Sequence, residues 1–111
     1  MKIVNLNELE IQCVSHNPNV KKRVLLKNGE LGNITQFAQS IIPTGQFIEA
    51  HSHADIAEVF LVESGIGVIR INNLAFKLEP GFCAVVEPGE MHSIENNGRK
   101  DLVLTYFGIK I

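Results

Sequence analysis

Three histidines and one glutamate give this 111-residue chain its clearest chemical signal. His51 and His53 are separated by a single serine, and Glu58 follows five residues after the second histidine. Side chains alternate between the faces of a β-strand, so the two histidines would point the same way with Cα atoms about 6.6–6.8 Å apart. Both imidazoles could then reach one metal ion, although a His-x-His pair on a strand is more often two ordinary surface or pocket residues.

Glu58 can join the two histidines only if the chain between them is irregular. Its separation from His53 is an odd number of residues, which on a straight strand would place it on the opposite face. A turn or bulge within residues 54–57 would restore the common face, and Ala54-Asp55 interrupts the β-branched run there. The sequence therefore predicts a break in the strand between the histidine pair and Glu58.

His92 lies 34 residues beyond Glu58, shortly after Pro88-Gly89, a dipeptide that fits the centre of a type II turn. That turn would direct the strand beginning near His92 back across the fold, although a lone histidine there is most often a satisfied pocket or surface residue. Together, three histidines and one glutamate form a nitrogen and oxygen donor set that suits Fe(II), Mn(II), Ni(II), Zn(II) or Cu(II). Four such ligands in an octahedral sphere would leave two positions for water, substrate or dioxygen.

The elements that must position these residues are short β-strands. Apolar, β-branched runs alternate with Gly, Pro and Asn at roughly the 8–12-residue spacing of an all-β sandwich or barrel. No long window has helical periodicity, apart from a short helical turn near residues 6–9 that Asn5 or Asn7 could cap. Residues 1–22 look otherwise irregular, because Pro18 indicates a loop, which a short strand or turn could precede. Asn72-Asn73 would make a two-residue turn. The predicted strands are 23–26, 33–42, 46–53, 58–64, 66–71, 74–78, 82–87, 92–96 and 102–111.

Composition excludes several classes of protein. A net charge of −2 with interspersed charges gives no basic surface for nucleic acid and no polybasic membrane patch. The N-terminal residues hold no uninterrupted apolar stretch of the kind found in a signal peptide, which indicates a cytoplasmic protein with no membrane segment. Cys13 and Cys83 lack a CxxC spacing, so we expect two free thiols, with Cys83 buried in a strand; a disulfide or a catalytic thiol is the alternative.

Two segments resemble the conserved motifs of the cupin superfamily. Residues 45–65, GQFIEAHSHADIAEVFLVESG, are similar to the first motif, G-x5-H-x-H-x3,4-E-x6-G, at every fixed position. Residues 81–96, GFCAVVEPGEMHSIEN, resemble the second motif, G-x5-P-x-G-x2-H-x3-N. The departure is Glu87, where the family has proline, but Pro88 follows one place later and still allows a turn. The two motifs cover about a third of the chain, and we read it as a small single-domain cupin of the bacterial type.

The resemblance implies an all-β fold, an antiparallel double-stranded β-helix or jelly-roll barrel, formed by residues 1–111 as one domain. It also implies one divalent transition metal in the mouth of the barrel, held by His51, His53, Glu58 and His92. Small cupins of this kind commonly form homodimers, and residues 1–26 are the expected N-terminal arm and dimer contact.

The function that the resemblance implies is that of a metal-dependent enzyme acting on a small organic substrate. An Fe(II) site would suit a dioxygenase, whereas Mn, Ni or Zn would suit an isomerase or lyase. Glu58 has a second role as a proton shuttle if it leaves the metal. The alternative is a non-catalytic small-molecule-binding or sensor cupin, and a third option is a fold with a vestigial site.

Strand alternation adds candidates for the wall of the pocket, each of which could equally be an ordinary core or surface residue. Few positive charges fall at wall positions, which gives little support for a phosphorylated or strongly anionic substrate. On the last strand, the hydroxyl of Tyr106 could contact a bound ligand. The pocket candidates are Gln36, Ser40, Phe47, Glu49 and Phe60.

Overall fold

The computed structural model describes residues 1–15 and 17–111, and these residues form one short 3-10 helix and a series of β-strands. All of the strand pairings are antiparallel. The all-β class expected from the sequence is therefore confirmed. The elements are η1 Leu6–Glu8, β1 Gln12–Val14, β2 Asn17–Leu26, β3 Ile34–Ile42, β4 Phe47–His51, β5 Ile56–Ser64, β6 Gly67–Ile71, β7 Leu74–Leu78, β8 Cys83–Val86, β9 His92–Glu95 and β10 Leu102–Lys110.

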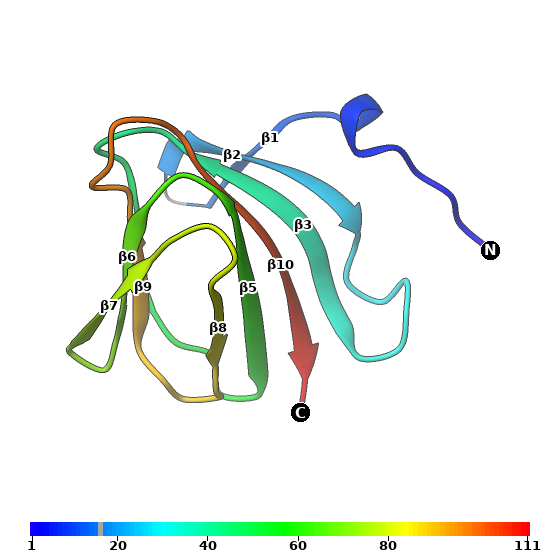
Figure 1. Cartoon of the computed structure of the whole chain (residues 1–111). Helices are drawn as coiled ribbons and strands as arrows, with labels where there is room; N and C mark the ends of the chain where they lie inside the picture. The colour runs from blue at the N-terminus through cyan, green and yellow to red at the C-terminus, as the bar shows by residue number, and fades with distance from the viewer. Residues whose placement is uncertain (16) are drawn as a thin grey trace.

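Two sheets form the barrel. One has six strands in the order β1-β2-β3-β10-β5-β8, and the other has four in the order β4-β9-β6-β7. Figure 1 shows the two sheets facing each other, with the N-terminal residues extending away from the barrel beyond β2 and β3. Because β4 and β5 follow each other in sequence but lie in different sheets, the first motif crosses from one wall of the barrel to the other.

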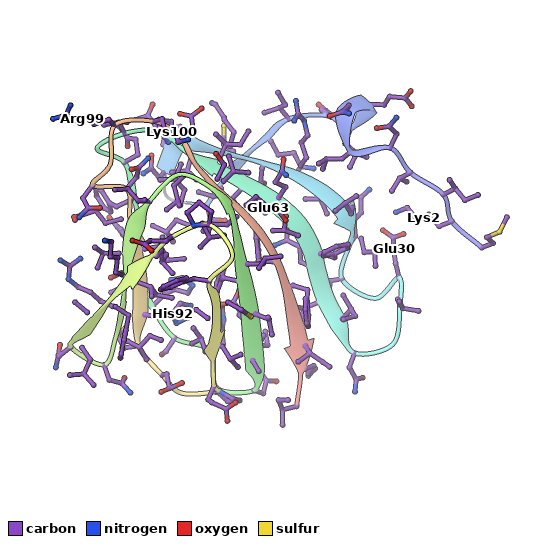
Figure 2. The ribbon with its side chains drawn as sticks, in the orientation of Figure 1. Lys2, Glu30, Glu63, His92, Arg99 and Lys100 are labelled. Carbon is purple, nitrogen blue, oxygen red and sulfur yellow. The ribbon has the colours of Figure 1, made fainter. Side chains whose placement is uncertain are left out.

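The core lies between the sheets and follows strand alternation. In β10, Leu102, Leu104 and Tyr106 point inward and are buried, whereas the intervening residues are only partly covered. Figure 2 shows His92 among the side chains inside the barrel, while Arg99 and Lys100 lie at its surface. The other fully buried apolar side chains are Val20, Ala38, Ile42, Val62, Ile69, Leu78, Val86 and Ile94.

Asn96, the last residue of the second motif, joins three segments of the chain. Its side chain is fully buried, and its Nδ2 donates to the carbonyl oxygens of Ile42 at 2.7 Å and Lys100 at 2.8 Å. Its Oδ1 accepts from the backbone N–H of Gly98 at 2.9 Å. Asn96 thus satisfies buried backbone groups that water does not reach, which is a structural role.

Two turns agree with the sequence predictions. Asn5 caps η1 by accepting a hydrogen bond from the N–H of Asn7 at 3.0 Å, as expected for a short helical turn at this point. Asn72 and Asn73 both have positive φ, 48° and 74°, which is the conformation of a two-residue type I′ hairpin turn between β6 and β7.

Two predictions were wrong. The loop expected around Pro18 is the first part of β2, which begins at Asn17, whereas β1 is a short strand of the kind expected before it. Pro18 is tolerated because it falls where the β1–β2 pairing is interrupted, so its missing N–H costs no ladder bond. Cys83 is exposed because it faces outward on β8, at the edge of the six-stranded sheet. Both cysteines are free, as predicted.

Candidate metal centre

The histidine candidates lie at the ends of two paired strands. His51 ends β4 and is the register partner of His92, which begins β9. The pairing contains a bulge between Ile48 and His51, and this extra residue turns His51 toward the interior. Glu58 comes from β5 in the opposite sheet, after the irregular residues 52–55. The strand break predicted before Glu58 is present, but it begins directly after His51, so His53 lies within the break and not on the strand as expected.

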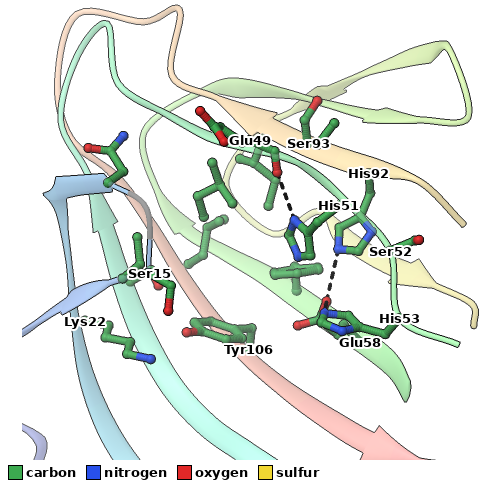
Figure 3. A pocket seen from close by; sticks show the side chains of 18 of the residues that line it. Ser15, Lys22, Glu49, His51, Ser52, His53, Glu58, His92, Ser93 and Tyr106 are labelled. Carbon is green, nitrogen blue, oxygen red and sulfur yellow. Dashed lines mark hydrogen bonds and ion pairs between the residues drawn. The ribbon is translucent and has the colours of Figure 1, made fainter. Parts of the chain in front are cut away.

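The ligating atoms of three candidates come together. One atom each from His51, Glu58 and His92 lies within 4.8 Å of the other two. The Nε2 of His92 is 3.0 Å from Oε1 of Glu58, and the rings of His51 and His92 have centroids 4.3 Å apart. Figure 3 shows these side chains on one side of the cavity. Imidazole and carboxylate donors at this spacing fit a divalent transition metal.

His53 lies next to this group but outside its tightest part. Its Nε2 is 3.5 Å from Oε1 of Glu58, and its ring centroid is 5.1 Å from that of His51. Its side chain is 37% exposed, whereas that of His92 is 2% exposed. All four side chains expected to bind a metal thus gather at one side of the cavity, although they come from both sheets, and we call this group the histidine wall: His51, His53, Glu58 and His92.

Backbone carbonyls fix the orientation of two of the rings. The Nδ1 of His51 donates to the carbonyl oxygen of Glu49 at 2.8 Å, and the Nδ1 of His92 donates to that of Glu90 at 3.0 Å. A carbonyl can only accept, so the proton of each ring is on Nδ1. The Nε2 atoms are thereby the ring nitrogens that can coordinate a metal, an arrangement typical of histidine ligands.

The hydrogen bond between His92 and Glu58 favours the charged form of each side chain. Burial alone would lower the pKa of His92, but the hydrogen bonds to Glu58 and to the Glu90 carbonyl outweigh it and raise that pKa. Burial would likewise raise the pKa of Glu58, but the hydrogen bond from His92 outweighs it and lowers that pKa. A metal must therefore displace a proton from Nε2 of His92.

A cavity of about 620 Å³ opens in front of the histidine wall. Of the pocket candidates, Gln36, Ser40, Glu49 and Phe60 line this cavity, and so does Tyr106. Phe47 does not line it and is 46% exposed. The bulge after Ile48 shifts strand parity, so Ile48 takes the inward position that simple alternation assigned to Phe47.

Tyr106 lies near the middle of the cavity wall, between β3 and β5. Its ring stacks on Phe60 with centroids 5.5 Å apart, and its hydroxyl accepts a hydrogen bond from Nε2 of Gln36 at 3.2 Å. Burial raises the pKa of Tyr106, and a hydrogen bond with Ser40 offsets only part of this effect. The side chain is therefore a neutral phenol near neutral pH.

The sequence interpretation missed the cationic residue of the cavity. Lys22 of β2 lines it, and its Nζ donates to Oε1 of Gln36 at 3.0 Å. Lys22 has the inward parity of Val20 and Val24 in β2, a signal hidden by the assumption that residues up to 22 are irregular. We call this side of the cavity the lysine wall: Lys22, Gln36, Ser40 and Tyr106.

Residues 38–108 match the family described as the Cupin domain. This match covers more than half of the chain and includes all of the histidine wall. The chain therefore belongs to the cupin family, as its two motifs indicated.

Two individual proteins have sequences similar to this chain. A protein named oxalate-binding protein from Thermotoga maritima is 33% identical over 66 residues, which are 60% of this chain and 54% of the relative, so the match spans about half of that protein. An uncharacterized protein from Methanocaldococcus jannaschii is 25% identical over 92% of this chain and 82% of the relative.

Solved structures show the same fold. A predicted oxalate decarboxylase from Thermotoga maritima superposes with a TM-score of 0.91 at 25% identity, covering 99% of this chain and all of that one. KdgF from a Halomonas species superposes with a TM-score of 0.82 at 15% identity, covering 100% and 96% of the two chains. At the latter identity the likeness concerns the fold alone.

Proposed function

We propose that this cupin binds one divalent transition metal through His51, His53, Glu58 and His92, and that it is an enzyme acting on a small organic acid. The observation that carries the proposal is the convergence of His51, Glu58 and His92, with atoms within 4.8 Å of one another, at the wall of a cavity. When bound, the metal would supply Lewis-acid chemistry by polarising an oxygen of the substrate.

The cavity and the relatives support a carboxylate as the group that binds at the metal. Both matches from Thermotoga maritima are named for oxalate, the sequence relative as a binding protein and the solved structure as a predicted decarboxylase. We propose that the metal is Fe, Mn, Ni, Zn or Cu, and that its identity decides the type of reaction. With Fe(II) the protein would be a dioxygenase, and with another metal it would be an isomerase or lyase.

The side chains around the cavity have separate roles in this proposal. Glu58 is only 15% exposed and contacts both His53 and His92, so it can accept or deliver a proton at Oε1 as a proton shuttle. Tyr106, a neutral phenol, can donate a hydrogen bond to the substrate. The apolar ring of Phe60 and the adjacent Ile94 and Leu104 cover the inner end of the cavity and exclude water there.

The test is turnover by metal-reconstituted protein. Protein purified without a chelating tag is stripped and reloaded separately with Mn(II), Fe(II), Ni(II) or Zn(II), and incubated with oxalate while formate and carbon dioxide are measured. Oxygen consumption by the Fe(II) form is followed with catechols, thiols and β-diketones. His92→Ala protein treated identically is the control, and turnover that survives this change would refute the proposed site.

A non-catalytic binding or sensor protein is the second candidate, and the name of the Thermotoga oxalate-binding relative favours it. An enzyme releases a product from the bound acid, whereas a binding protein does not. If oxalate or another small acid raises the melting temperature of the metal-loaded protein, while none of the four metal forms releases a product, the chain is a binding protein.

We also propose that the chain forms a homodimer. Phe37, Phe107, Val59 and Val85 are register neighbours across the outer face of the six-stranded sheet, and Val85 is 53% exposed. An apolar row of this kind is typical of an interface. One edge of the same sheet is formed by β1, with β2 beside it, and both strands lie within the arm expected to contribute to the contact.

The dimer is tested by sedimentation equilibrium. The chain has a mass of 12.3 kDa, so we expect twice that value, with a shift to the single-chain mass for Val85→Glu. A single-chain mass for the unaltered protein at 100 μM would contradict it.

None of the helices in the described residues is long and apolar enough to cross a membrane. A cytoplasmic location is a further proposal, supported by the two free thiols.

A further inference from the structure

The lysine wall holds a positive charge without a negative partner. Lys22 is the one Lys or Arg side chain among the described residues that line the cavity. In the part of the chain that the structure describes, no ion pair involves Lys22, although three other lysines pair with glutamate or aspartate. An ammonium group has three hydrogens, and the hydrogen bond to Gln36 uses one of them. Lys22 can therefore donate to an anion in the cavity.

The neighbours of Lys22 hold it in position and extend the polar surface. Gln36 accepts from Lys22 through Oε1 and donates through Nε2 to the hydroxyl of Tyr106, at 3.0 and 3.2 Å. The second hydrogen on Nε2 of Gln36 is available to a ligand. These three side chains come from β2, β3 and β10, which are adjacent strands of one sheet. The wall thus presents an ordered set of donors.

The lysine wall and the histidine wall lie at opposite sides of the cavity, and Glu58 shares a sheet with Lys22, Gln36 and Tyr106. Figure 3 shows Lys22 on one side and the three histidines with Glu58 on the other, with Tyr106 between them. Gln36 and Glu58 are both register partners of Gly108 on β10, from its two sides. Their Cα atoms are therefore two strand spacings apart, about 9–10 Å. Two anionic groups bound at the two walls must be joined by a spacer.

The charges of the cavity match a dianion. A divalent metal and Lys22 together contribute three positive charges, and Glu58 contributes one negative charge, which leaves two positive charges. The side chain of Glu49 is exposed at the rim, where water screens it. Two carboxylates balance this charge, whereas a carboxylate with a phosphate would exceed it. A single lysine with an amide neighbour also fits a carboxylate, because phosphate has more acceptor oxygens to satisfy.

We propose that the ligand of this cavity is a dicarboxylate with a spacer of about two or three carbons, one carboxylate binding at the histidine wall and the other at Lys22 and Gln36. This inference rests on the proposed metal-dependent function and adds the substrate class to it. Oxalate, whose two carboxylates are directly bonded, is too short to reach both walls and would occupy only the histidine wall. Lys22 is then a residue that determines specificity.

Calorimetric titration of Mn(II)-loaded protein with matched ligands tests the proposal. Succinate and butyrate have the same chain length, but butyrate lacks the second carboxylate. We expect succinate to bind about 10- to 100-fold more tightly than butyrate, the range expected for a hydrogen bond to a charged group. In Lys22→Met this ratio should fall to about threefold or less, while the affinity for oxalate stays within about twofold of that of the unaltered protein.

Two control variants make the result specific. Lys21→Met removes the same charge from the neighbouring position of β2, whose side chain is exposed and points away from the cavity. It should keep the full succinate preference, and Lys22→Arg should keep most of it because the charge remains. Far-ultraviolet circular dichroism and manganese content establish that each variant is folded and loaded.

The possible results distinguish a failure of this inference from a failure of the proposed metal-dependent function. A succinate-to-butyrate ratio that Lys22→Met leaves unchanged, with oxalate binding intact, overturns the role of Lys22 and leaves the metal-dependent function standing. The same holds if succinate binds no better than butyrate to the unaltered protein. If Mn(II) does not load, or neither oxalate nor succinate binds to the loaded protein, the proposed function fails and this inference fails with it.

Discussion

The two walls of the cavity differ in how the chain builds them. Three members of the histidine wall lie within eight residues of one another, and the fourth follows a turn that the sequence marks clearly. The lysine wall combines Lys22, Gln36, Ser40 and Tyr106 from three strands that become neighbours only through long-range pairing. The first wall has the donor set of a metal site, and the second has hydrogen-bond donors for a ligand. Each can therefore be altered without the other.

The largest expected effect is the loss of metal from the histidine wall. His92→Ala removes a buried donor that is held in place by the Glu90 carbonyl, so we expect metal affinity to fall by about 100-fold or more. Lys22→Met should leave metal content unchanged, because Lys22 belongs to the other wall. Metal content is measured by mass spectrometry after gel filtration, with Ser52→Ala as the control. Equal losses in His92→Ala and Lys22→Met would contradict the separation of the walls.

A second prediction concerns a motif residue that belongs to neither wall. Asn96→Ala would leave the carbonyl groups of Ile42 and Lys100 and the N–H of Gly98 without partners. We expect a loss of about 2–4 kcal/mol in the free energy of unfolding, and a melting temperature lower by about 10–20 °C. The neighbouring Asn97→Ala, at an exposed position, should change the melting temperature by less than about 2 °C. A neutral Asn96→Ala would show that these hydrogen bonds do not support the fold.

A third prediction uses pH to distinguish proton from metal at the histidine wall. The raised pKa of His92 contributes stability that is fully present below its unfolded-state pKa and is lost as pH rises through the raised value. The lowered pKa of Glu58 contributes stability above its unfolded-state pKa, which is lost as pH falls through the lowered value. A metal competes with the proton on His92, so it binds better as pH rises.

The increase in melting temperature on adding Mn(II) should therefore grow between about pH 6 and pH 8. Differential scanning fluorimetry measures this increase, and His92→Ala, which should bind almost no metal, is the control that should show no increase at either pH. An increase of equal size at both pH values would show that His92 does not exchange its proton for the metal. The lysine wall should have little part in this dependence, so Lys22→Met should follow the unaltered protein.

The smallest expected effect is on the lysine wall. Tyr106→Phe removes the hydroxyl that accepts from Gln36, and with it one neutral hydrogen bond. We expect the affinity of the Mn(II)-loaded protein for succinate to fall by about three- to tenfold, less than in Lys22→Met, with metal content unchanged. Calorimetric titration measures the affinity for succinate, and mass spectrometry measures the metal content. A larger loss than in Lys22→Met would place the main anion contact at Tyr106 and not at Lys22.

Much of the fold was predictable because local signals agree with it. The Asn72-Asn73 turn and the Asn5 cap follow from backbone chemistry that these residue types favour. The convergence of His51, Glu58 and His92 also followed, since the motif fixes both the strand break and the return of the chain.

The rest depends on strand pairing, which a single sequence does not contain. Phe47 was assigned inward because the bulge between Ile48 and His51 is invisible to simple alternation. Lys22 was missed because Pro18 suggested a loop, whereas the interrupted pairing of β1 and β2 accommodates it within a strand. Cys83 was expected to be buried because its strand is apolar, but an edge position leaves its outward face exposed.

The most direct test of the central claim is the metal content of protein purified without a chelating tag, before and after reconstitution. If His51, His53, Glu58 and His92 form one metal site, elemental analysis should find close to one equivalent of a transition metal per chain, and His92→Ala should hold almost none. Less than about a tenth of an equivalent in the unaltered protein, even after reconstitution, would contradict the claim.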